Sequence, residues 1–152
     1  MDTAAFLNKS RETIVGEAEA SLEARHVRHY EAVRGQELRE RLDRLFDRLI
    51  ESVEDRDLTP ILRYTRELAE ERFKGGYGLS EVQAAFNVLE ESVWSHVLAS
   101  LDPSEFAEAL GLVSSALGAA KDNLGRTYVS LATDSHAPSL NVRRLFAGSE
   151  GT

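Results

Sequence analysis

A heptad of leucines and glycines between Pro103 and Asp134 constrains the fold more than any other feature of this chain. The leucines are Leu110, Leu117, Leu124 and Leu131, and the glycines that directly follow the first three are Gly111, Gly118 and Gly125. The spacing predicts one long helix, in which each interior glycine costs roughly 1 kcal/mol relative to alanine. We therefore expect another helix to approach closely where the side chains are missing.

The glycines lie about 100° around the helix axis from the adjacent leucines, so the long helix has two contact directions. Two explanations stay open. Either the glycines face a neighbouring helix of the same chain, which is the simpler expectation, or they form the seam of a homodimer. The interface candidates are Gly111, Gly118, Gly125, Leu110, Leu117 and Leu124.

Helical periodicity also covers most of the chain before Pro103. Apolar residues recur at spacings of three and four in the segments 3–24, 37–55, 60–74 and 80–101. No run alternates apolar and polar residues as a strand does. Because the connections are short, we expect neighbouring helices to pack antiparallel. The predicted fold is all-α: an antiparallel bundle of four to five helices in residues 1–134, with a long C-terminal helix.

Local signals mark the ends of these helices. Three capping pairs are Thr59 with Pro60, Ser80 with Gln83, and Asp102 with Glu105. Glycines between residues 75 and 78 predict a tight turn, and Gly16 is the expected weak point of the first helix. After residue 134 the pattern stops, so residues 135–152 are predicted to be a tail that is partly mobile or forms a short surface helix.

Composition limits the classes of function. The net charge of -8, from 26 acidic and 18 basic residues, repels a phosphate backbone and argues against nucleic acid as a partner. The chain has no cysteine, which excludes disulfides and thiolate metal sites. It has neither a signal-peptide pattern nor an apolar run long enough for a membrane. We expect a soluble cytoplasmic protein.

Two histidine sites are candidates for chemistry. Glu23, His26 and His29 have the spacing of half a carboxylate-bridged metal site, although the second half is missing and a solvated helix junction explains them as well. His96 lies beside the apolar seam of its helix, where it is either a core histidine or an axial ligand of haem in a small-ligand sensor. Trp94 is predicted to serve packing. The sequence predicts no bound cofactor and no enzyme.

Polar residues interrupt the two helices that flank Pro103. If these helices pack antiparallel, the side chains that meet in a polar network are Asn87, Glu90, Glu91, Lys121, Asp122, Asn123 and Arg126. Such a network sets the register of the two helices or lines a small pocket.

Several segments resemble one known family. They are Glu37–Leu42 (ELRERL), Leu68–Phe73 (LAEERF), Gly78–Phe86 (GLSEVQAAF), Val93–Trp94 and Leu117–Asp122 (LGAAKD). Across residues 37–132 the chain resembles the N-terminal helical domain of the RsbT co-antagonist family, in its RsbRD-type branch. The resemblance implies a regulatory or sensory input module of bacterial stress signalling that acts on protein partners. Because the sequence ends soon after the bundle, we expect either a protein that acts alone or a fragment of a larger regulator.

Overall fold

The structure is a computed structural model that describes residues 2–25 and 36–136. The helices of this part are α1 (Thr3–Lys9), α2 (Arg11–Ala24), α3 (Gln36–Asp55), α4 (Thr59–Lys74), α5 (Leu79–Ser100) and α6 (Pro103–His136). The described residues contain no strand. The prediction of an all-α fold is confirmed.

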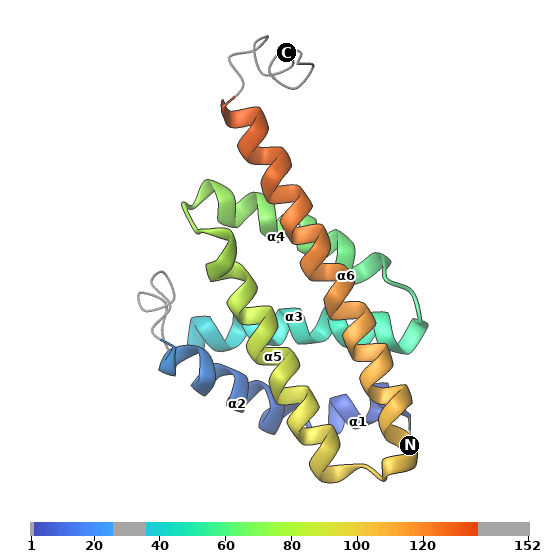
Figure 1. Cartoon of the computed structure of the whole chain (residues 1–152). Coiled ribbons are helices and arrows are strands. Elements are labelled where there is room, and N and C mark those ends of the chain that lie inside the picture. The colour runs from blue at the N-terminus through green and yellow to red at the C-terminus, as the bar shows by residue number, and fades with distance from the viewer. Residues whose placement is uncertain (1, 26–35, 137–152) are drawn as a thin grey trace.

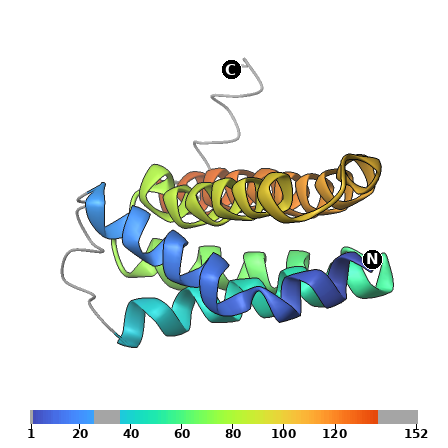
Figure 2. The ribbon, with the colours of Figure 1, turned by 90° about the horizontal axis from the view of Figure 1, so that it is seen from below.

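The helices form two layers. Figure 2 shows α5 and α6 together in one layer and α1 to α4 in the other. In Figure 1, α5 and α6 run steeply across α2 and α3, so the two layers cross instead of forming one set of parallel axes. The antiparallel arrangement expected from short loops holds for α5 with α6. The crossing of the layers could not be predicted from loop length.

The core lies between these layers. The apolar face predicted for α3 is buried throughout, with no side chain more than 6% exposed, and comprises Leu38, Leu42, Leu45, Phe46, Leu49, Ile50 and Val53. From α5 and α6, Phe86, Leu117 and Leu124 belong to the same core cluster with 0% exposure. Each such side chain contributes about 1.5–3 kcal/mol on burial. The long-range packing of these apolar stripes holds the two layers together.

The first predicted helix is divided in two, which corrects the expectation of one helix over residues 3–24. The break lies at Ser10, whose ψ of 7° departs from helical geometry, whereas Gly16 lies inside the unbroken α2. Phe6 and Leu7 before the break and Ile14 after it are all buried. We attribute the break to this packing, because a change of direction at Ser10 lets both short helices reach the core.

The capping groups predicted at two helix starts are also corrected, although α4 begins at Thr59 and Pro60 as expected. The N-cap of α4 is Leu58, and Thr59 is already helical; Asp57, just before the cap, accepts the backbone N–H of Thr59 at 3.0 Å and the Thr59 hydroxyl at 2.8 Å. These two hydrogen bonds, the backbone one first, hold the pKa of Asp57 below its usual value. At α5 the capping carboxylate is Glu81, which accepts the N–H of Gly78 at 2.7 Å. The predicted Ser80–Gln83 capping pair is wrong, because the N-cap of α5 is Gly78, two residues before Ser80.

The remaining local signals are confirmed. Glu105 accepts the N–H of Asp102 at 3.2 Å, which is the carboxylate half of a capping box. In the glycine turn between α4 and α5, Gly76 has a φ of +84°, a backbone conformation that favours glycine. The predicted tail lies outside the described residues, except that α6 continues to His136.

Candidate functional surface on helices α5 and α6

The glycines of α6 define an open surface. We call Gly111, Gly118 and Gly125 the glycine face. A Cβ atom placed on any of the three would meet no atom of residues 2–25 and 36–136 within 4 Å. Gly111 and Gly118 are exposed and Gly125 is half-buried. The expectation that these glycines face a neighbouring helix of the same chain is therefore wrong.

The leucine side of α6 explains this outcome. Leu117 and Leu124 are 0% exposed and pack in the core, while Leu110 is only partly buried. Because α6 turns this side toward the other helices, the face about 100° away points outward. Of the six interface candidates, the three glycines and Leu110 keep access to solvent. An interface at the glycine face stays a prediction.

Side-chain hydrogen bonds fix the register between α5 and α6. Trp94 Nε1 donates to Ser114 Oγ at 3.2 Å, and Lys121 Nζ donates to Asn87 Oδ1, also at 3.2 Å. The two α5 residues are seven positions apart, and so are their α6 partners in the opposite direction. The helices are therefore antiparallel neighbours in constant register.

The predicted polar network is smaller than expected. Lys121 Nζ also lies 2.8 Å from Glu90 Oε1, so Asn87, Glu90 and Lys121 form one connected group. Lys121 is 28% and Glu90 21% exposed, which protects this ion pair in part from solvent.

The other predicted members have different partners. Glu91 pairs with Arg25 at 2.8 Å, and Asp122 pairs with Arg126 at 2.8 Å along the surface of α6. Asn123 donates to the backbone carbonyl of Leu62 on α4 at 3.0 Å. A sequence shows which residues are polar, but the rotation of each helix decides which of them meet.

Exposed apolar side chains lie at both ends of the α5–α6 pair, and they were not predicted from the sequence. Trp94 is 41% and Leu98 52% exposed on α5, and Val129 is 65% exposed on α6. Trp94 was expected to be a packing residue, yet its indole lies partly in solvent. A shallow groove between the helices near Val129 is lined by Leu79, Gln83, Lys121, Asp122, Gly125, Arg126 and Val129.

The histidine candidates have different outcomes. The ring of His96 lies 5.6 Å from the ring of Phe6, which gives this half-buried side chain a packing contact between α5 and α1. Haem binding at His96 stays an alternative to the core histidine. Glu23 is exposed near the end of α2, whereas His26 and His29 lie outside the described residues. Within the described ranges, no group of three or more acidic, histidine or cysteine residues is placed to hold a metal ion.

Comparison with known families gives a match over most of the chain. A family model described as the RsbT co-antagonist protein rsbRD N-terminal domain matches residues 11–137, a range that contains α2 to α6. The chain belongs to this family. The resemblance found in the sequence is thereby confirmed and extended to α2.

Membership in the RsbT co-antagonist family identifies a regulatory domain of stress signalling. Searches of curated proteins and of solved structures gave no match. Among residues 2–25 and 36–136, no helix has the length and apolar character needed to cross a membrane.

Proposed function

We propose that this RsbT co-antagonist domain is a non-enzymatic signalling module that works through protein contacts, with the glycine face as its contact with a second copy. The observation that carries the proposal is the open space at Gly111, Gly118 and Gly125. Together these glycines cost roughly 3 kcal/mol of helix stability. No contact within the described part of the chain offsets this cost. A helix from another subunit is the simplest structure that would use the gap.

The spacing of the glycines suits a symmetric dimer. A two-fold axis at Gly118 would place Gly111 opposite Gly125 of a second copy, because the outer two are equally distant from the middle one. In this register Asp122 faces Ser114 of the other α6, and Arg126 faces Leu110. Neither charged residue of one α6 therefore faces a residue of the same charge on the other, and glycines occupy the crossing point.

Family membership supports the signalling part of the proposal. A regulatory domain transmits its state to other proteins, and a surface that forms or breaks a helix contact can do so. We place the module in the cytoplasm, with protein partners in a stress-signalling pathway. In this proposal the polar group of Asn87, Glu90 and Lys121 keeps α6, which carries the glycine face, in a fixed register with α5.

Light scattering across a range of protein concentrations tests the proposal. The decisive variant is Gly118→Leu, because the open space at Gly118 lets the monomer fold with a side chain there. Gly16→Leu is the matched control, since Gly16 is also helical and its added Cβ would also meet no atom within 4 Å. Circular dichroism checks that both variants are folded.

We expect the wild-type chain and Gly16→Leu to form dimers as concentration rises, and Gly118→Leu to stay monomeric. A wild-type protein that is monomeric at every concentration would contradict the dimer. So would a Gly118→Leu variant that associates as strongly as the control.

A further inference from the structure

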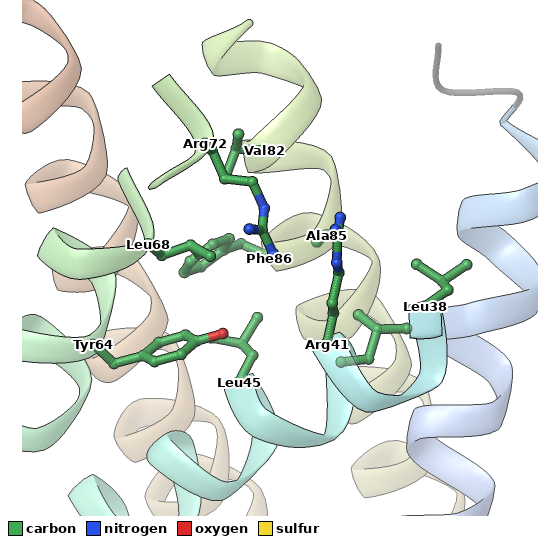
Figure 3. Close-up of a pocket in the computed structure, with 10 residues that line it drawn as sticks. Leu38, Arg41, Leu45, Tyr64, Leu68, Arg72, Val82, Ala85 and Phe86 are labelled. Atoms are coloured by element: carbon green, nitrogen blue, oxygen red, sulfur yellow. The ribbon is translucent and has the colours of Figure 1, made fainter. Parts of the chain in front are cut away.

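A small cavity between α3, α4 and α5 contains two arginines and no acidic residue. Figure 3 shows Arg72 reaching into it from α4, with its guanidinium group toward Phe86, and Arg41 from α3, with its guanidinium group toward Ala85. The complete lining is Leu38, Arg41, Leu42, Leu45, Tyr64, Leu68, Arg72, Val82, Ala85 and Phe86. The wall is therefore apolar apart from two cations and one phenol.

Arg72 is the most informative residue of this cavity. It is only 5% exposed, and its Nε atom is buried without a hydrogen-bond partner. Its Nη1 atom pairs with Glu71 at 2.9 Å, but Glu71 is 72% exposed, so solvent weakens that pair. A buried charged group with an unsatisfied donor is costly, and a native structure that keeps one needs a reason. The Nε atoms of Arg39 and Arg48 also lack a hydrogen-bond partner, but both side chains are far more exposed, and Nε of Arg39 lies 3.6 Å from Oδ2 of Asp43.

Arg41 brings a second positive charge to the same place. Its side chain is 17% exposed, and Nη2 lies 3.1 Å from Oε2 of Glu37, a residue that is itself 60% exposed. The ring of Tyr77 lies near both cations: its centroid is 5.8 Å from Cζ of Arg41 and 5.6 Å from Cζ of Arg72, and its hydroxyl accepts a hydrogen bond from Nη1 of Arg41 at 3.2 Å. Two guanidinium groups around one ring repel each other, and an anion between them would remove that repulsion.

The size of the cavity limits the ligand. The unfilled space is about 310 Å³ including the mouth, but only about 20 Å³ of it is open to the centre of a water molecule. That room suits a group little larger than one water. Planar oxyanions match the fork of donors that a guanidinium presents, so the free Nε edge of Arg72 favours an oxyanion over a spherical ion.

We propose that this cavity binds a small monovalent oxyanion, of the size of formate, between Arg72 and Arg41. The anion would accept a hydrogen bond from the unpartnered Nε of Arg72 and compensate the charge of both arginines. The apolar wall formed by α3 and α5 would exclude water and strengthen the interaction. The inference goes beyond the proposed function, since the cavity lies away from the glycine face.

Side-chain nuclear magnetic resonance of the arginine Nε–H groups tests the site directly. The probe is sodium formate, which replaces sodium fluoride at constant ionic strength. We expect a saturable shift of the Arg72 Nε–H signal, with a midpoint on the order of 1 mM. The Nε–H of Arg48 is an internal control, because it is also buried without a partner but its residue lies outside the cavity lining.

Three variants complete the test. Arg72→Met keeps an apolar side chain and removes the charge. We expect this variant to bind formate at least tenfold more weakly, as measured from the Nε–H signal of Arg41. Arg41→Met gives an independent answer if Arg72→Met does not fold, while Arg48→Met should bind formate as the wild type does. Shifts that do not saturate, equal shifts at Arg48, or unchanged binding in both cavity variants would overturn the site. None of these outcomes depends on dimerisation, which light scattering measures separately.

Discussion

Replacing a glycine of the glycine face by alanine should stabilise the isolated chain. In Gly118→Ala the new methyl group would meet no atom within 4 Å, so no steric term opposes the gain in helix propensity. The expected increase in the free energy of unfolding is about 1 kcal/mol. For a chain of this size it corresponds to a rise in Tm of roughly 2–4 °C.

Urea unfolding of dilute protein, followed by far-UV circular dichroism, measures this gain. Gly16→Ala on α2 is the matched control and should give a similar increase, because an added Cβ there would also meet no atom of the described residues within 4 Å. At high protein concentration the stability gains of the two variants should differ. A dimer seam at Gly118 would make the new Cβ a steric obstacle there, whereas the gain at Gly16 would persist.

A loss of stability in dilute Gly118→Ala would refute the reasoning. It would mean either that another part of the chain covers the glycine face or that α6 is not a continuous helix at this point. If Gly118→Ala and Gly16→Ala gain the same stability at all protein concentrations, the argument from helix propensity stands. The proposed dimer contact at Gly118 is then contradicted.

Three further predictions concern the fold. Gly76→Ala should lower the free energy of unfolding by about 1–2 kcal/mol in urea titrations, because the φ of +84° is strained for alanine; wild-type stability in this variant would show that the turn can rearrange. Phe86→Ala should cost about 3–5 kcal/mol, since its side chain is 0% exposed, and a loss below 1 kcal/mol would contradict that burial. Asp57 has a lowered pKa, so its carboxylate stabilises the fold above the unfolded-state pKa, and this contribution is lost as pH falls through the folded-state value. Thermal unfolding of wild type and Asp57→Asn across pH should therefore show a wild-type advantage at neutral pH that disappears in acid, and a gap independent of pH would refute the assignment.

Local patterns predicted much of this architecture correctly. The apolar stripe of α3, the glycine turn with Gly76, and the continuous α6 through three glycines all follow from spacing along one segment. They could be predicted because hydrophobic periodicity and backbone preferences act over a few residues. The wrong predictions of capping groups at Thr59 and Ser80 also concern only a few neighbouring residues. In both cases a carboxylate one or two residues away binds a backbone amide at the helix start.

The arrangement of surfaces required the packed chain. Spacing along α6 placed leucines and glycines on two faces, but only the positions of α4 and α5 show that the leucine face is covered and the glycine face is open. The cavity with Arg41 and Arg72 was not predicted at all, because its residues come from three helices. The periodicity of a segment determines the angle between side chains around its own axis. Which of those directions meets another helix depends on long-range packing, and that information is distributed over the whole chain.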